Sequence, residues 1–147
     1  MNKQPETRQD YHYFLSIPTR WMDNDVYGHV NNVHYYSFFD TVIADYLIHH
    51  GGLHFGEDPV VGFAIESLCQ YKRSIAYPEI VEAGLRVARI GNSSVRYAIG
   101  IFTAGYAEPA ATGYFVHVFV DRTNDNRPAP VPEKIRIALT KILVIGD

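Results

Sequence analysis

One apolar stripe of helical period constrains the fold of this chain more than any other feature. The stripe lies in the segment NVHYYSFFDTVIADYLIHH, which begins at Asn32. Apolar residues recur there at a spacing near 3.6, the period of an α-helix with one buried face. The stripe consists of Val33, Tyr36, Phe39, Ile43 and Tyr46/Leu47. Gly51 and Gly52 follow as a C-cap would, so the pattern predicts one long buried helix.

Most of the remaining sequence has the composition of β-strands. Residues 11–20 form an aromatic and β-branched segment, which predicts a first strand before the helix. After the helix, the strand-like segments are 60–77, 79–91, 93–105 and 111–122. The tight turn Gly91-Asn92-Ser93 predicts a hairpin between two of them. Residues 133–143 predict either a short terminal helix or an extended arm.

A single helix that is apolar around most of its circumference needs a curved sheet around it to bury that surface. The sequence therefore predicts an α+β fold in which a mostly antiparallel sheet wraps a long central helix. The 147 residues, 47% of them hydrophobic, fit one domain over residues 11–147. The polar residues 1–10 are expected to be disordered. Aromatic residues on both strand faces favour contact with a second copy, so we expect a homodimer or homotetramer.

Charge and composition argue against several classes of function. A net charge of −3 without any Lys/Arg run argues against nucleic-acid binding, which needs clustered positive charge. No run of roughly 18 apolar residues occurs, so no membrane span is expected. The single cysteine, Cys69, cannot form an internal disulfide, and the first ten residues contain no apolar signal core. These features favour a reducing, cytoplasmic location.

The loop before the helix carries the most specific motif. It reads Asp23-x-Asp25-x-x-Gly28-His29-Val30-Asn31-Asn32-x-x-Tyr35 and leads into an aromatic-rich helix with an acidic residue at Asp40. This run resembles the N-terminal signature of hotdog-fold acyl-CoA thioesterases of the 4-hydroxybenzoyl-CoA thioesterase-like group. Weaker matches follow in the family's order at Tyr71-x-Arg73, Tyr77-Pro78-Glu79, Gly91-Asn92-Ser93-Ser94, Thr112-Gly113, Phe119-Val120-Asp121 and Arg127-Pro128 to Val131-Pro132. The resemblance covers residues 12–140 and implies a hotdog fold.

The mouth of the predicted helix suits an oxyanion for reasons of backbone electrostatics. The first N–H groups of a helix have no intrahelical acceptor, and the positive end of the helix dipole lies behind them. A thioester carbonyl under attack becomes an oxyanion, which each fixed backbone donor stabilises by roughly 2.7–4 kcal/mol. Asp25, held beside that carbonyl, would attack it as a nucleophile or take a proton from water as a general base. Gly28 would let the backbone approach the substrate closely.

The resemblance implies a set of site residues. Asp25 is the implied catalytic carboxylate, and the backbone N–H near Asn32 is the implied oxyanion donor. Gly28 and His29 complete the catalytic set. The implied substrate-binding residues are Val30, Asn31, Tyr35, Arg73 and, near the pantetheine arm of CoA, Gly91, Asn92, Ser93 and Ser94. CoA would be part of the substrate, and neither a cofactor nor a metal is expected.

Each of these residues also has a simpler interpretation. Asp25 would serve equally as a cap of the loop or helix, and His29 as a hydrogen-bonded loop histidine. The turn that begins at Gly91 is first of all a hairpin turn. Asp23 and Asp40 are expected to have structural roles. Contacts with CoA phosphates or plain solvated surface charge are the alternatives for Lys72, Arg73, Arg89 and Arg96.

The sequence thus predicts an acyl-CoA thioesterase, and the main alternative is a hotdog protein that binds acyl-CoA without cleaving it. A hydratase is a weaker alternative, because the Asp/His pair on a longer loop is not evident. Two departures from the family pattern are Ser74, where many relatives carry proline, and Asp40, where glutamate is common. They leave acyl preference and subunit packing open. The choice between CoA and acyl carrier protein is open as well.

Overall fold

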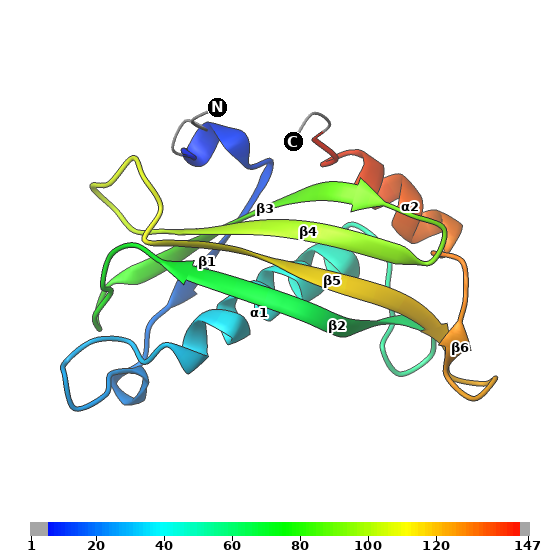
Figure 1. Ribbon diagram of the computed structural model, residues 1–147, viewed down its shortest axis with the longest axis horizontal. Coiled ribbons are helices and arrows are strands. Elements are labelled where there is room, and N and C mark those ends of the chain that lie inside the picture. The colour runs from blue at the N-terminus through cyan, green and yellow to red at the C-terminus, as the bar shows by residue number, and fades with distance from the viewer. Residues whose placement is uncertain (1–5, 145–147) are drawn as a thin grey trace.

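The computed structural model describes residues 6–144, and an antiparallel sheet of six strands is its largest element. The strands lie in the order β1-β3-β4-β5-β2, and the short β6 pairs with β5 (Figure 1). Their bounds are β1 (Tyr13–Pro18), β2 (Val60–Tyr71), β3 (Ile80–Ile90), β4 (Ser94–Phe102), β5 (Ala111–Asp121) and β6 (Arg127–Pro128). The helices are α1 (Val33–His49) and α2 (Glu133–Thr140), with short 3-10 turns η1 (Arg8–Asp10) and η2 (Trp21–Asp23).

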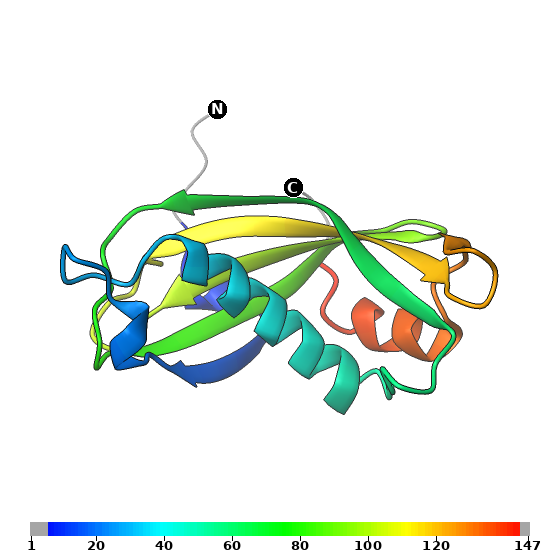
Figure 2. The ribbon, with the colours of Figure 1, turned by 90° about the horizontal axis from the view of Figure 1, so that it is seen from below.

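The long helix α1 lies across one face of the sheet, which curls around it (Figure 2). The opposite face, called the outer face below, carries the N-terminal segment. The predicted α+β architecture, a sheet wrapped around a central helix, is therefore confirmed. Within residues 6–144, no helix is long and apolar enough to cross a membrane.

The sheet covers a face of α1 that differs in part from the predicted stripe. The buried side chains of α1 are Tyr35, Phe38, Phe39, Val42, Ile43, Tyr46 and Leu47. The prediction is confirmed for four of its members but is wrong for Val33, which is 62% exposed, and for Tyr36, which is 36% exposed. The sheet covers the arc that positions 35, 38/39, 42/43 and 46/47 share. Val33 and Tyr36 lie at or beyond the edge of that arc.

Two glycines allow the close fit and the clean end of α1. A Cβ atom on Gly113 of β5 would lie 2.5 Å from Cε2 of Phe39, so the Phe39 ring packs against bare backbone. Gly52 has a φ of 66°, a left-handed conformation that favours glycine. The N–H of Leu53 then donates to the carbonyl of Leu47 at 3.0 Å, which closes the helix as the predicted C-cap does.

Residues 6–10 belong to the segment expected to be disordered, and in the structure they pack against the outer face. Arg86 of β3 forms an ion pair with Glu6 at 2.6 Å and donates to the carbonyl of Asp10 at 3.1 Å. The ring of Tyr11 rests on Gly100, where a Cβ atom would lie 2.7 Å from it. These partners are distant in sequence, and local polarity does not reveal them. Residues 1–5 lie outside the described residues.

The predicted strands occur in the predicted order, with changes in extent. The segment 60–77 leaves the sheet after Tyr71, because the N–H groups of Lys72 and Arg73 both turn to the carbonyl of Ala110, at 2.8 and 3.0 Å. For the segment 133–143, the sequence allows either a helix or an extended arm. The structure has the helix α2 over Glu133–Thr140 of this segment. Its buried residues Ile135, Ala138 and Leu139 belong to the same core as α1.

A pair of buried polar groups interrupts the apolar core. His117 of β5 is 6% exposed, and its ring lies edge-on to that of Tyr97 of β4, with 4.9 Å between the centroids. The His117 Nδ1 atom and the Tyr97 hydroxyl have no hydrogen-bond partner within the described residues. Burial lowers the pKa of His117 to about 4, because desolvation penalises the charged imidazolium.

Acidification should therefore destabilise the fold through His117. The pKa of His117 is about 4 in the folded protein, against an ordinary value of 6.5 that applies to the unfolded chain. As the pH falls, the unfolded state therefore binds the proton first. The free energy of unfolding should drop by roughly 3 kcal/mol as the pH falls through this window, and the contribution should be constant at higher pH. Urea unfolding of His117→Phe should show a flatter pH profile than the wild type. Equal slopes in the wild type and His117→Phe would contradict the assignment.

Candidate functional site

A tight turn shapes the loop between β1 and α1. An isolated bridge joins Asn24 to Val30, and the N–H of Asp25 donates to the carbonyl of His29 at 2.9 Å. Gly28 closes the turn with a φ of 79°. A Cβ atom on Gly28 would meet nothing within 4 Å, so the described residues require this glycine for its backbone conformation. Its predicted role in a close approach to substrate stays a prediction.

The buried side chain of Asp23 holds this loop together through hydrogen bonds. Its buried carboxylate accepts hydrogen bonds from the Arg20 guanidinium at 2.8 and 3.0 Å and from the Arg20 backbone N–H at 2.8 Å. Nδ1 of His34 lies 3.9 Å from the same carboxylate. Burial acts to raise the pKa of Asp23, but the hydrogen bonds from Arg20 outweigh it and hold the pKa below its usual range. These contacts agree with the structural role expected for Asp23.

Asn31 links the loop to the first turn of α1. Its Oδ1 atom accepts the N–H of Val33 at 3.1 Å, which caps the helix. Its Nδ2 atom donates to Oδ2 of Asp25 at 3.4 Å. The other oxygen of the Asp25 carboxylate accepts the N–H of Tyr27 at 2.9 Å. Asp25 therefore caps the loop turn, and Asn31 caps the helix.

The backbone amide of Asn32, at the N-terminus of α1, is a free donor as far as residues 6–144 are concerned. Neighbouring amides all donate to oxygen atoms of residues 6–144, namely those of Val30, Asn31, Val33, His34 and Tyr35. The N–H of Asn32 has no acceptor among the described residues. Because Asn32 directly precedes α1, this N–H lies at the positive end of the helix dipole.

A cavity of about 310 Å³ opens at this amide, between the N-terminus of α1 and the end of β2. It is called the helix-mouth cavity below. Its lining consists of His29, Val30, Asn32, Tyr35, Tyr71, Lys72, Arg73 and Ser74. The fold thus brings together five of the residues that the sequence predicts for the site. Asp25, Gly28 and Asn31 are close in sequence but do not line the cavity.

Tyr71 is a cavity residue that sequence reasoning misses, although the Tyr71-x-Arg73 element carries a signal for it. Its hydroxyl donates to the carbonyl of Asn32 at 3.2 Å. Its ring lies edge-on to that of Tyr35, with 5.0 Å between the centroids. Burial raises the pKa of Tyr35 and of Tyr71 to about 12. Both hydroxyls are therefore neutral hydrogen-bond donors near neutral pH.

Arg73 supplies the cavity with positive charge. Its Nη1 atom donates to Oγ1 of Thr103 at 3.1 Å. Its guanidinium carbon lies 3.6 Å from the ring centroid of Tyr106, a cation–π contact. Its Nη2 atom is buried and has no hydrogen-bond partner within the described residues. This donor can serve an anionic group of a ligand.

The turn from Gly91 to Ser94 does not reach the helix-mouth cavity of its own chain. The N–H of Gly91 donates to the carbonyl of Ser94 at 2.7 Å, as the hairpin interpretation requires. Register places Ser94 level with Val118 and Phe63. Phe63 is eight residues along β2 from Tyr71, or roughly 26 Å at the rise of a strand. Contact between this turn and CoA stays a prediction.

Asp40 lies outside the cavity, on the exposed side of α1. Neighbouring atoms that displace water from its carboxyl raise the pKa of this group. Within residues 6–144, no three side chains of His, Cys, Asp or Glu gather closely enough to hold a metal ion.

Residues 19–139 match the sequence profile of the thioesterase-like superfamily. A search of curated proteins found no match. The chain is similar to the solved PA5185 protein of Pseudomonas aeruginosa, with 48% identity, a TM-score of 0.92 and coverage of 95% of this chain and 97% of that one. It is also similar to the PA2801 protein of that species, a candidate thioesterase, with 28% identity, a TM-score of 0.79 and coverage of 85% and 95%. A predicted thioesterase from Bacillus stearothermophilus shares the fold, at 24% identity, a TM-score of 0.77 and coverage of 92% and 98%.

The two loop carboxylates should differ in their effect on stability. Asp23→Asn should lower the free energy of unfolding by about 2–3 kcal/mol, because it weakens buried hydrogen bonds to the Arg20 guanidinium. Asp25→Asn should cost less than about 1 kcal/mol, because it affects one loop N–H and one long contact with Asn31. Urea unfolding followed by the fluorescence of the single tryptophan measures both. Equal losses would contradict the division of roles.

Proposed function

The chain belongs to the thioesterase-like superfamily, and on that premise we propose that it hydrolyses acyl-CoA thioesters at the mouth of α1. The observation that carries the proposal is the N–H of Asn32, which has no acceptor within residues 6–144 and belongs to a residue lining the helix-mouth cavity. A thioester oxygen bound there would accept this hydrogen bond, which strengthens as the oxygen gains charge. The donor therefore favours the transition state over the bound substrate.

Asp25 is the proposed catalytic carboxylate. As a general base it would take a proton from water while the hydroxide adds to the thioester carbon. The C–S bond of the tetrahedral intermediate then breaks, and the thiolate takes up a proton to leave as the thiol. As a nucleophile, Asp25 would instead add to the thioester carbon and expel the thiolate, which leaves as the thiol. Water would then hydrolyse the resulting mixed anhydride to the free acid and the Asp25 carboxylate. Both routes use the same oxyanion site.

Cavity residues would hold the substrate on either side of the thioester. His29 is exposed at the rim and would position substrate or water, while Val30 and Tyr35 supply apolar lining. Tyr71 would fix the loop through its hydrogen bond to the carbonyl of Asn32, which orients the peptide next to the free N–H. Arg73 would meet an anionic part of the carrier.

One observation favours a second candidate function, binding of acyl-CoA without cleavage. Asp25 does not line the helix-mouth cavity of the single chain, and its carboxylate is engaged by the N–H of Tyr27. If that arrangement persists with substrate bound, no base reaches the thioester. The protein would then act as a sensor or carrier of acyl-CoA.

Thiol release from a panel of short, long and aromatic acyl-CoAs tests the proposal. The wild type should release thiol, and Asp25→Asn should lower kcat by at least about 100-fold, because it removes the base or nucleophile. Asp40→Asn is the matched control and should retain activity, because Asp40 lies eight residues beyond Asn32 on α1, roughly 12 Å along the helix from the proposed oxyanion donor. Binding without thiol release would favour the second candidate. Equal rates for the wild type and Asp25→Asn would place catalysis on another group.

We also propose that the protein works as a homodimer joined along β2. This strand has 12 residues and is an edge of the sheet, and among the described residues it pairs only with β5. Phe63, Ile65 and Leu68 expose apolar surface along it. Long edge strands of this kind are open to pairing with another chain. Two copies related by a two-fold axis would pair their β2 strands antiparallel and extend the sheet.

Such a dimer would complete the site from the second copy. Antiparallel overlap of the two β2 strands sets the Val60 end of one beside Tyr71 of the other. Register places the hairpin turn that ends at Ser94 near the Val60 end. The turn of the second copy would therefore approach the helix-mouth cavity of the first copy, which the turn of the first copy cannot reach. This arrangement accounts for the predicted contact between Gly91–Ser94 and the substrate.

Light scattering and thiol release together test the dimer. The wild type should have at least twice the 16.7 kDa mass of one chain. Ile65→Lys should shift the mass toward one chain and lower activity, because it places a charge in the middle of the paired edge. Ile137→Lys is the matched control, since Ile137 is exposed on α2, away from β2. A wild-type monomer with full activity would refute the dimer.

A further inference from the structure

The hydroxyl of Tyr35 is a buried donor that the proposed mechanism does not use. Tyr35 lies in the first turn of α1 and is 3% exposed, yet its hydroxyl has no hydrogen-bond partner within residues 6–144. It is also not among the unpartnered side-chain atoms that the described residues shut off from solvent. Because Tyr35 lines the helix-mouth cavity, its hydroxyl therefore opens on that cavity. Burying a hydroxyl costs free energy unless a ligand or water accepts its hydrogen bond.

Helix geometry carries this hydroxyl toward the free amide. Asn32 has helical backbone angles, with a φ of −56° and a ψ of −29°, and its carbonyl accepts the N–H of Tyr35 at 3.2 Å. Residues three apart are neighbours on a helix surface, with roughly 5–6 Å between their Cβ atoms. Helical side chains also lean toward the N-terminus, so the Tyr35 ring is directed back over the turn that begins at Asn32. Both donors consequently belong to one wall of the helix-mouth cavity.

Tyr71 holds both donors in place. Its hydroxyl donates to the carbonyl of Asn32 at 3.2 Å, and its ring lies edge-on to that of Tyr35, with 5.0 Å between the centroids. The ring of Phe38 is also edge-on to Tyr35, with 5.9 Å between the centroids. Two such contacts restrain the Tyr35 ring. A donor that is fixed before the reaction needs no reorganisation when charge develops on the substrate.

The other donors at the helix-mouth cavity are exposed or already in use. The exposed lining residues include His29, Asn32, Lys72 and Ser74. Water competes for the hydrogen bonds of exposed side chains, which reduces what each bond contributes. The hydroxyl of Tyr71 already donates to the carbonyl of Asn32.

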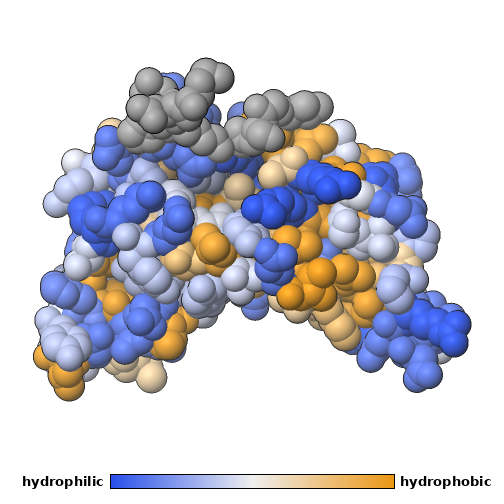
Figure 3. All heavy atoms as spheres, viewed as in Figure 1, coloured by the Kyte–Doolittle hydropathy of each residue, from blue (hydrophilic) through white to orange (hydrophobic). Residues whose placement is uncertain are grey.

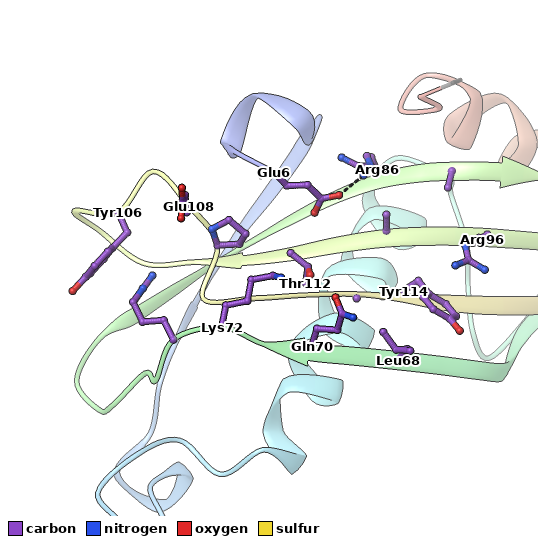
Figure 4. A pocket seen from close by; sticks show the side chains of 15 residues that line it. Glu6, Leu68, Gln70, Lys72, Arg86, Arg96, Tyr106, Glu108, Thr112 and Tyr114 are labelled. Carbon is purple, nitrogen blue, oxygen red and sulfur yellow. Dashed lines mark hydrogen bonds and ion pairs between the residues drawn. The ribbon is translucent and has the colours of Figure 1, made fainter. Parts of the chain in front are cut away.

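Arg73 also has a buried donor without a partner among the described residues, but its contacts lie toward the outer face. Its guanidinium donates to Thr103 and stacks on Tyr106, both in the loop between β4 and β5. Tyr106 borders a hollow of about 840 Å³ on the outer face (Figure 4). Hydrophilic residues are widespread on that face (Figure 3). Tyr35 is thus the buried neutral donor that remains for a thioester oxygen at α1.

We propose that the Tyr35 hydroxyl is a second oxyanion donor, which binds the thioester oxygen together with the N–H of Asn32. This inference rests on the proposed function. As the carbonyl carbon is attacked, the electron pair of the C=O bond moves onto the oxygen, and both hydrogen bonds strengthen. When the pair returns, the C–S bond breaks and the thiolate departs.

Tyr35 keeps its proton throughout these steps. Burial raises its pKa to about 12, whereas the ordinary pKa of a thiol is roughly 8.5. Proton transfer from Tyr35 to the departing thiolate is therefore unfavourable. The hydroxyl acts by hydrogen bonding alone, and the thiolate takes its proton from water.

Tyr35→Phe tests the assignment, because it removes one hydroxyl and keeps the ring. On the acyl-CoA that the wild type hydrolyses fastest, this variant should lower kcat roughly 100-fold with little change in KM. Tyr36→Phe is the matched control and should keep the wild-type kcat, since Tyr36 is the next residue, is 36% exposed and does not line the cavity. Thermal unfolding confirms that each variant is folded. Wild-type kcat in Tyr35→Phe would overturn the proposal while the thioesterase stands, and no hydrolysis by the wild type would refute the thioesterase itself.

A thioether analogue separates an oxyanion donor from a residue that only shapes the site. The S-alkyl-CoA of the same chain length has no carbonyl oxygen, so calorimetry should give it equal affinity for the wild type and Tyr35→Phe. Weaker binding to the variant, by the factor that kcat/KM falls, would overturn the assignment.

Aryl thioesters of the same acyl group test the departing sulfur, because their thiols leave without help from a donor. The loss of kcat in Tyr35→Phe should persist with them if the hydroxyl binds the oxyanion. A loss that disappears with aryl thioesters would move the hydroxyl to the sulfur and overturn the proposal.

Discussion

Packing of the aromatic face of α1 into the curled sheet is the contact on which the rest of the structure depends. Phe39 lies against the bare backbone of Gly113, and Val42 and Ile43 continue the same buried face. This packing fixes where the N-terminus of α1 emerges, because a helix held along its length cannot shift its ends independently. The emerging end lies beside Tyr71, the last residue of β2. The helix-mouth cavity is the space between these two ends.

The free amide at this mouth results from the satisfaction of its neighbours. Asp23 accepts from Arg20 through its carboxylate and from Asn31 through its backbone carbonyl. Asn31 in turn accepts the N–H of Val33. With these acceptors in use, the N–H of Asn32 is left for a ligand. The N-terminus of α1 therefore offers a ligand one defined hydrogen-bond donor, because the neighbouring donors of the loop already have acceptors.

The end of β2 connects the two faces of the sheet. Beyond Tyr71, the chain leaves the ladder when Lys72 and Arg73 both bond to the carbonyl of Ala110. These two residues consequently border both the helix-mouth cavity and a hollow on the outer face of the sheet. The same strand is the unpaired edge of the sheet. In the proposed arrangement, β2 therefore borders the substrate site at its end and forms the dimer contact along its edge.

The sequence by itself determined the long helix, the order of the strands, the central-helix architecture and the capping chemistry at Asn31. These depend on residues a few positions apart, whose periodicity and hydrogen bonding are local. Only the tertiary structure decided that Val33 and Tyr36 are exposed, because the covered arc of α1 depends on where the sheet lies. It also decided that Glu6 meets Arg86 and that Gly91 lies far from Asn32. Such contacts join residues tens of positions apart through strand register, which no local pattern encodes.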